Sequence, residues 1–320
     1  MIILVNFLVF FAGLFLLIFS SDWLIQGSVK ISRRFSLSPL FIGMVVVAFG
    51  TSAPEAGVGI MAALRDYKGI ALGNIIGSNI ANIALILGSC ALIFPLKISS
   101  KAVFKRELPF MLGAVLLFYF LSLDGLISRI DGILFLVCFI LFCLFSYKGA
   151  REIFDTAEIE NFHFRNIFKK INNPGLTWGA TLISLAGIVW GADLMVKGGS
   201  SLAYIWGVKP WLVGITIFAV GTSLPELAAS LSAAVKKIPS LSVGNIIGSN
   251  IFNILLVLGL VALIRPIPVD ASYLRFEYPA LLLFSFGLYI LMKTGNIISR
   301  KEGLALFIGY LIFIFFLLRR

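Results

Sequence analysis

Two glutamates, Glu55 and Glu226, are the only charged residues in two long apolar segments. An ionisable side chain in such a segment is costly, and a functional role is therefore its default interpretation. Pro54 and Pro225 directly precede the glutamates. Proline removes a backbone donor and clashes with the carbonyl four residues earlier, so we expect both helices to break there. Carbonyl oxygens released beside a carboxylate would form a site for a cation.

Uncharged oxygen-bearing side chains accompany both glutamates. Thr51 and Ser52 lie four and three residues before Glu55, which places all three on one helical face. A neighbouring apolar segment in each half carries polar residues four positions apart, for which hydrogen bonding between helices is the alternative role. The uncharged candidates are Thr51, Ser52, Asn74, Ser78, Asn82, Thr222, Ser223, Asn245, Ser249 and Asn253.

The predicted site contains only oxygen ligands: carboxylates, hydroxyls, amide oxygens and carbonyls. Such a set suits hard cations such as calcium and sodium, and it does not suit zinc or copper. Two carboxylates neutralise one divalent ion or two monovalent ions, which provides an electrostatic basis for exchanging one for the other. A protonated acid or a salt bridge is the alternative for each glutamate, but no basic residue lies in the core of these four helices.

The composition requires a membrane environment. Of the 320 residues, 60% are hydrophobic and 13% are charged, whereas a soluble domain carries about 25% charged residues. The net charge of +11 comes from short segments between apolar runs, which is typical of membrane topology and not of nucleic-acid binding. The three cysteines lack metal-ligand spacing, and no motif of a hydrolytic enzyme is present. We therefore expect no enzymatic activity, no cofactor and no nucleic-acid partner.

Ten segments are apolar enough to cross the membrane, for which about 20 residues are needed. They are 2–26, 38–63, 70–93, 106–123, 129–147, 176–196, 210–235, 241–264, 276–292 and 302–318. The polar stretch 148–175 separates five segments from five. With both termini outside, most of the 26 basic residues fall on the cytoplasmic side, as the positive-inside rule requires.

The two halves of the chain are copies of one unit. With an offset of 171 residues, GNIIGSNIANIALILG at 73–88 aligns with GNIIGSNIFNILLVLG at 244–259, and GTSAPE at 50–55 aligns with GTSLPE at 221–226. Because each unit has an odd number of helices, the second enters the membrane inverted, as in many transporters. The predicted domains are a first five-helix repeat at 1–147 (motif 43–88), a cytoplasmic linker at 148–175, and a second, inverted repeat at 176–320 (motif 214–259).

The paired GTSxPE and GNIIGSNIxN segments resemble the two alpha repeats of the calcium/cation antiporter superfamily, especially its prokaryotic sodium/calcium exchanger-like members. The resemblance covers nearly the whole chain. It implies an all-α integral membrane protein of ten helices, in which helices 2, 3, 7 and 8 bind ions and helices 1 and 6 slide across them. It also implies that Glu55 and Glu226 coordinate calcium with the carbonyls of Thr51 and Thr222. Sodium would use both glutamates with Ala48, Ser52, Ser78, Ala219, Ser223 and Ser249.

Asn253 departs from part of this superfamily, because the potassium-dependent branch and an archaeal type carry Asp at that position. Its repeat partner, Asn82, is also an asparagine. Only two central carboxylates remain, which argues against potassium dependence.

The resemblance implies a secondary active antiporter that exchanges calcium for sodium by alternating access, as a monomer in the plasma membrane of a prokaryote. A proton-coupled antiporter for calcium or another divalent cation is the alternative. The superfamily's proton exchangers place an acid soon after the GN of helices 3 and 8, where this chain has IIGSN. Away from the site, Asp22 and Asp193 are repeat partners near the ends of helices 1 and 6, and we expect them to pair with nearby lysine or arginine.

Overall fold

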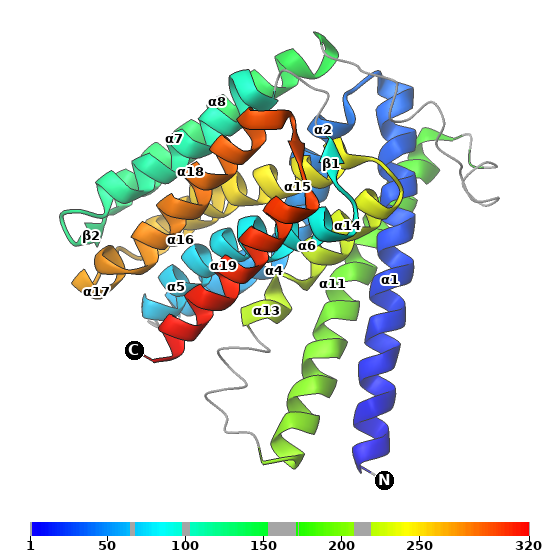
Figure 1. Ribbon diagram of the computed structural model, residues 1–320, viewed down its shortest axis with the longest axis horizontal. Helices are drawn as coiled ribbons and strands as arrows, with labels where there is room; N and C mark the ends of the chain where they lie inside the picture. The colour runs from blue at the N-terminus through cyan, green and yellow to red at the C-terminus, as the bar shows by residue number, and fades with distance from the viewer. Residues whose placement is uncertain are drawn as a thin grey trace.

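The structure, a computed structural model, describes residues 2–64, 68–97, 103–152, 171, 173–207 and 219–319. Helices make up nearly all of this part of the chain (Figure 1), in agreement with the predicted all-α class. Most of the predicted linker, 153–170 and 172, lies outside the described residues. So does 208–218, which includes the start of the predicted seventh helix.

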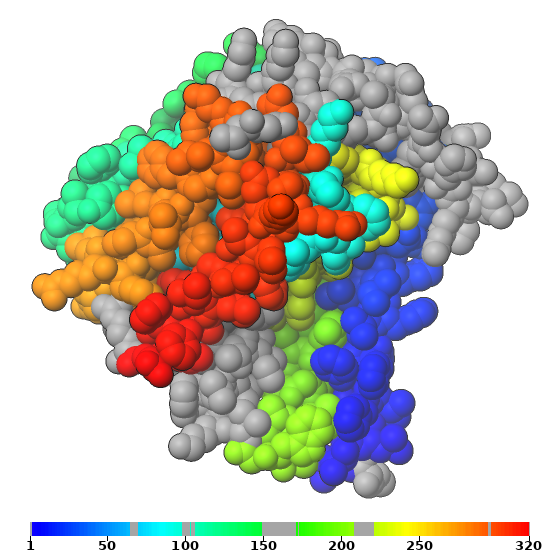
Figure 2. All heavy atoms as spheres, in the orientation of Figure 1, coloured from blue at the N-terminus to red at the C-terminus, as the bar shows by residue number. Residues whose placement is uncertain are grey.

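Two long helices, α1 (Ile2–Phe35) and α11 (Pro174–Ile205), lie side by side in opposite directions. Their ends project together beyond the rest of the molecule, as Figures 1 and 2 show. Glycines bring the two backbones together. A Cβ at Gly191 would lie 2.7 Å from the backbone nitrogen of Leu17, and a Cβ at Gly198 would lie 2.8 Å from that of Phe10. Such close approach is the usual basis of helix association in lipid, where no hydrophobic force acts between helices.

The predicted C-terminal ends of these two helices were wrong. α1 continues to Phe35 and not to residue 26, and α11 continues to Ile205 and not to residue 196. The predicted ends followed the fall in hydropathy, but polar residues can end an apolar span without ending a helix. Each helix stops where a residue beyond it adopts a positive φ, 51° at Ser36 and 78° at Gly207, as is common at helix C-termini.

The two helices that carry the glutamates are broken, as their prolines predict. In the first half the chain changes direction by 45° at Ser52. The backbone there has φ −82° and ψ 6°, and Ser223 in the second half has nearly the same values, −91° and 4°. This sparsely populated region of backbone space is common in functional sites. The segments are α2 (Pro39–Ile42), the π-helix η1 (Gly43–Val47), α3 (Ala48–Thr51) and α4 (Ala53–Leu64), then α13 (Ala219–Thr222) and α14 (Leu224–Val235).

A long buried helical segment, here called a rod, follows each broken helix. Each rod contains a π-helical stretch that the sequence analysis did not predict. The π-helical stretches are wider turns that recur at functional sites. In the second rod the N–H of Leu258 donates to the carbonyl five residues earlier, that of Asn253. The rods are α5 (Lys68–Ile80), η2 (Ala81–Leu87) and α6 (Gly88–Ile93), then α15 (Pro239–Ile251), η5 (Phe252–Val257) and α16 (Leu258–Ile264).

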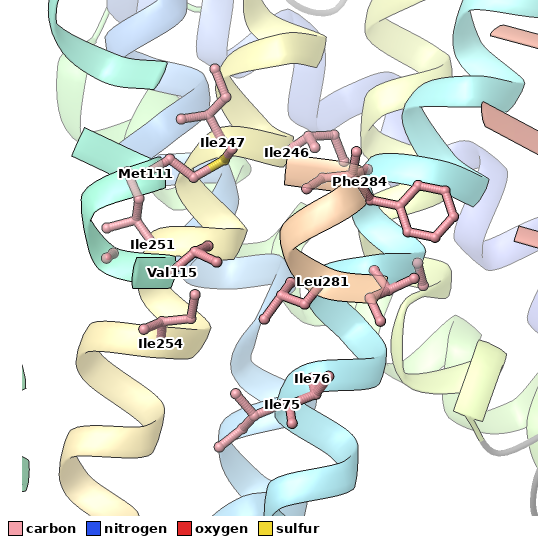
Figure 3. Packing of buried hydrophobic residues seen from close by; sticks show 14 of the residues in the cluster. Ile75, Ile76, Met111, Val115, Ile246, Ile247, Ile251, Ile254, Leu281 and Phe284 are labelled. Atoms are coloured by element: carbon pink, nitrogen blue, oxygen red, sulfur yellow. The ribbon is translucent and has the colours of Figure 1, made fainter. Parts of the chain in front are cut away.

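The remaining helices cover these rods with apolar side chains. Figure 3 shows residues of α5, α7, α15 and α18 packed into one cluster, in which Ile75 and its repeat partner Ile246 both lie fully buried. This packing holds the polar segments of the rods at the centre of the protein. The covering helices are η3 (Val103–Glu107) with α7 (Leu108–Leu121), α8 (Arg129–Glu152), α17 (Ala271–Arg275), α18 (Glu277–Gly295) and α19 (Arg300–Leu318).

Four short strands pair one half of the chain with the other. β1 (Leu96–Lys97) is antiparallel to β4 (Ile297–Ile298), with Leu96 opposite Ile298. β2 (Leu126–Ile127) is antiparallel to β3 (Ile267–Pro268), with Ile127 opposite Ile267. Leu96 and Ile267 are 171 residues apart, and so are Ile127 and Ile298. The two strand pairs are therefore copies of each other under the sequence repeat.

Within the described residues, six helices are each long and apolar enough to cross a membrane, and the bent segment 39–64 makes a seventh. α7 and α14 are shorter apolar helices of 14 and 12 residues. These lengths and compositions identify a helical membrane protein with several crossings.

We expect Gly248→Ala to destabilise the fold. α15 crosses α2, η1 and α3 closely, and a Cβ at Gly248 would lie 2.6 Å from Met44 Cα and 2.8 Å from Ala48 Cβ. Overpacking of this kind costs about 1–3 kcal/mol. Thermal melting in detergent should show a lower midpoint. The matched control is Gly113→Ala, where a Cβ meets nothing within 4 Å, and an equal loss in both variants would contradict the interpretation.

Candidate cation site

Each of the two glutamates accepts a hydrogen bond from a serine in the opposite half of the chain. The Ser52 hydroxyl donates to Glu226 Oε1 at 3.0 Å, and the Ser223 hydroxyl donates to Glu55 Oε1 at 3.3 Å. Glu55 is 1% exposed and Glu226 is fully buried. The two carboxylates are near enough for their charges to interact. The geometry therefore brings both acids together in the protein interior.

The two neighbouring asparagines hold the backbone of the broken helices. Asn74 Nδ2 donates to the Glu55 carbonyl at 3.3 Å, and Asn245 Nδ2 donates to the Glu226 carbonyl at 3.4 Å. The Thr51 hydroxyl lies 3.2 Å from Asn245 Oδ1 and 3.4 Å from the Ala48 carbonyl, and it can donate a hydrogen bond to either oxygen. The asparagines thus support the site through the main chain.

Several buried oxygens near the glutamates have no hydrogen-bond partner among the described residues. One oxygen of each carboxylate, Glu55 Oε2 and Glu226 Oε2, is of this kind. α14 packs against η2 and α4 against η5, which brings each glutamate's helix to the asparagine of the opposite half. Buried polar atoms normally find a partner, so these oxygens fit a bound cation. The others are Asn82 Oδ1, Asn253 Oδ1 and Ser249 Oγ.

Most of the remaining predicted residues are buried. Ala48 and Thr51 are fully buried and Ser78 is 4% exposed. The Ser249 side chain is fully buried and lies beside Glu226. Thr222 is half-buried. Ala219 begins α13, and its side chain lies outside the described part of the structure.

The structure adds polar residues that the sequence analysis did not select. Asn82 Nδ2 donates to Asn250 Oδ1 at 3.3 Å, and Asn250 Nδ2 contacts the Met111 sulfur at 3.7 Å. Asn245 Nδ2 also donates to the Ser230 hydroxyl at 2.9 Å. Ser230 follows Glu226 by four residues, so helical spacing would have pointed to it. The position of Asn250 within GNIIGSN gave no sign that it meets Asn82 of the other half.

The electrostatics of the site favour a cation over a salt bridge. Salt bridges in the described part of the chain involve Arg106, Lys197 and Lys236, and none of them contacts Glu55 or Glu226. The described residues contain no cluster of three or more His, Cys, Asp or Glu side chains. Two carboxylates surrounded by neutral oxygens are thus the charged part of the site. Buried charge without a counter-charge is costly, and a bound cation would offset it.

A hollow adjoins the first helix break. Its volume is about 520 Å³, and Gly50 and Ala53 line it together with one face of α11. The other lining residues are Leu185, Ala186, Val189, Trp190 and Asp193. Because Gly50 and Ala53 flank Thr51 and Ser52, this hollow reaches close to the candidate site.

Asp22 and Asp193 pair with lysines, as predicted, but in different ways. Asp22 on α1 pairs with Lys236 at the end of α14, and Gln26 Nε2 donates to it at 2.8 Å. Asp193 pairs with Lys197 of its own helix at 2.6 Å. The first pair joins two helices, while the second is local. The repeat partners therefore occupy unlike environments.

The broken membrane helices and their buried carboxylate pair define a transport protein for cations. A family model described as sodium/calcium exchanger protein matches residues 5–148 and again 176–319. The second match begins 171 residues after the first (176 against 5) and ends 171 residues after it (319 against 148), which is the offset of the sequence repeat. The chain belongs to the sodium/calcium exchanger protein family.

Known proteins resemble the chain over almost its full length. It is 33% identical to the sodium/calcium exchanger MaX1 of Methanosarcina acetivorans, with 98% of both chains covered. It is 38% identical to the inner membrane protein YrbG of Escherichia coli, with 85% of this chain and 84% of the relative covered. The solved structure of the sodium-calcium exchanger NCX_Mj soaked with zero Na⁺ and Ca²⁺ matches with a TM-score of 0.85 at 32% identity, covering 98% of this chain and 99% of that one.

These matches confirm the superfamily inferred from the paired motifs. The family consists of ion transporters, so the chain is a cation antiporter of the membrane and not an enzyme, and its family uses no cofactor.

We expect Lys236→Met to lower the melting temperature in detergent. The side chains of Lys236 and Asp22 are only 22% and 17% exposed, and removing one partner of a largely buried pair costs about 1–3 kcal/mol. The control is Lys197→Met, because its pair is 68% and 47% exposed and such pairs contribute about 0–1 kcal/mol. Equal melting temperatures for the two variants would contradict this ranking.

Proposed function

We propose that the protein exchanges calcium for sodium through one central site formed by Glu55 and Glu226. The reciprocal bonds between these glutamates and the serines of the opposite half carry the proposal. They show that each carboxylate is shared between the two helix breaks. The known exchangers that resemble the chain support calcium and sodium as its substrates.

The charge of the site accounts for exchange. With both glutamates ionised the empty site holds two buried negative charges, and one calcium or two sodium ions would balance them. Calcium takes about 6–8 oxygen ligands in flexible geometry. The proposed ligands are the carboxylates with the carbonyls of Thr51 and Thr222. Asn82 and Asn253 complete the site as uncharged ligands. The proposed sodium ligands are the glutamates with Ala48, Ser52, Ser78, Ala219, Ser223 and Ser249.

The proposed architecture is two inverted five-helix repeats, 1–147 and 176–320, which cross the membrane ten times. The antiparallel packing of α1 on α11 supports this arrangement. The two strand pairs also support it, because each pair joins a strand of the first half to a strand of the second. Alternating access would then move α1 and α11 across the rods that hold the site, with 148–175 as the cytoplasmic linker.

The proposed orientation follows from the distribution of basic residues. Both termini face outside and the linker faces the cytoplasm, because this places most Lys and Arg residues inside. The Escherichia coli relative is named an inner membrane protein, which supports a place in the plasma membrane of a prokaryote. Since the reciprocal bonds lie within one chain, the site needs no second copy, and we propose that the monomer is the functional unit.

Proton coupling is the alternative, because both glutamates can carry a proton. Proton exchangers of the superfamily are expected to place an acid early in the third and eighth predicted helices, 70–93 and 241–264, which begin with α5 and α15. α5 and α15 contain no acidic residue, which favours sodium.

We expect Glu55→Gln and Glu226→Gln each to reduce sodium-driven calcium uptake at least about tenfold. Each variant keeps the shape of the side chain and removes one of the two charges that balance calcium. The measurement is calcium-45 uptake into proteoliposomes with an imposed sodium gradient. Asp270→Asn, at an exposed position, is the control for loss of a charge elsewhere. Uptake at the unmodified rate in both glutamine variants would refute the assignment of the site.

We expect a sodium gradient alone to drive calcium uptake, and a pH gradient alone to leave it at the background rate. The physical reason is that sodium occupies the same oxygens that calcium leaves. Calcium-45 uptake is measured with sodium, potassium and proton gradients imposed one at a time. Uptake driven by the pH gradient without sodium would instead favour the proton-coupled alternative.

A further inference from the structure

Ser230 links the candidate site to the buried side-chain amide of Asn245, which contacts residues of both halves. It lies on α14 one turn beyond Glu226 and is fully buried. Its hydroxyl accepts a hydrogen bond of 2.9 Å from Asn245 Nδ2. The same amide donates to the Glu226 carbonyl at 3.4 Å, and its Oδ1 lies 3.2 Å from the Thr51 hydroxyl. Both donors and the acceptor of Asn245 are thus engaged.

The bond to Ser230 has no counterpart in the first half. The residue 171 positions earlier is Gly59, which has no side chain. A Cβ there would meet Val257 and Val261 at 3.3 Å, so the site of the missing hydroxyl faces apolar side chains. Asn74, the repeat partner of Asn245, donates to the Glu55 carbonyl at 3.3 Å. The predicted ligands are of the same residue types in both halves, but the hydrogen bond from Asn245 to Ser230 occurs in the second half only.

We propose that Ser230 is a positioning residue, which fixes the Asn245 amide and thereby the main chain at Glu226 and the side chain of Thr51. This inference rests on the proposed function, since it assumes that Glu226 and Thr51 contact the transported ion. An asparagine with every polar group engaged has one orientation. Without the Ser230 hydroxyl, one buried N–H loses its acceptor, and the amide can rotate away from Thr51 or from the Glu226 carbonyl.

The asymmetry has a direct consequence for binding. Asn245 bonds both to Glu226 of its own half and to Thr51 of the other half. Asn74 lacks the extra restraint, because glycine replaces serine. The half of the site at Glu226 is therefore held more firmly than the half at Glu55, by the one bond between Asn245 and Ser230.

The test is Ser230→Ala in the full-length protein. We expect the apparent KM for calcium to rise about three- to tenfold, with a smaller change in kcat, because the variant disturbs ligand geometry without removing a ligand. The calcium concentration that half-maximally raises the melting temperature should increase by the same factor. The matched control is Ser285→Ala, which deletes an equally buried hydroxyl that has no hydrogen-bond partner and should leave both values unchanged.

A double-mutant cycle shows whether Ser230 acts through Asn245. In an Asn245→Ala background, adding Ser230→Ala should change the KM less than twofold, because the amide it orients is gone. Additive effects, or a single Ser230→Ala variant with an unchanged calcium KM, would overturn the proposal. Failure of the proposed function is distinguishable, because the unmodified protein would then show neither calcium uptake nor calcium-dependent stabilisation.

Discussion

Two carboxylates buried side by side, each held by a serine from the opposite half of the chain, are the constraint on which the structure depends. Neither Glu55 nor Glu226 has a basic partner among the described salt bridges. Their negative charge in a medium of low polarity is unfavourable without a cation. The helix breaks lie at Ser52 and Ser223, the two residues whose hydroxyls reach the carboxylates of the opposite half.

The internal duplication explains how one chain meets this constraint. The repeated unit brings the same residue types to the centre from both halves. The serine-to-glutamate bonds and the two strand pairs cross between the halves, whereas each asparagine-to-carbonyl bond lies within one half. The same logic places α1 against α11 in antiparallel contact, because they are the first helices of the two units.

The departures from symmetry are as informative as the symmetry. Asp22 reaches Lys236 on another helix, while Asp193 pairs within α11 and borders the hollow beside Gly50. Unlike contacts at these equivalent positions distinguish the two halves. Ser230 and Gly59 add a difference that is fixed in the sequence and does not depend on conformation.

The sequence by itself determined the membrane environment, the duplication, the superfamily and the two glutamates with their breaks. These features are readable because hydropathy, proline and a constant offset are properties of the chain, independent of its packing. Tertiary structure alone decided that Ser223 meets Glu55, that Asn82 meets Asn250, and that α1 and α11 extend beyond their apolar spans. The two contacts join residues 168 positions apart. Such pairs form only when whole helices pack, and no local pattern specifies which side chains then face each other.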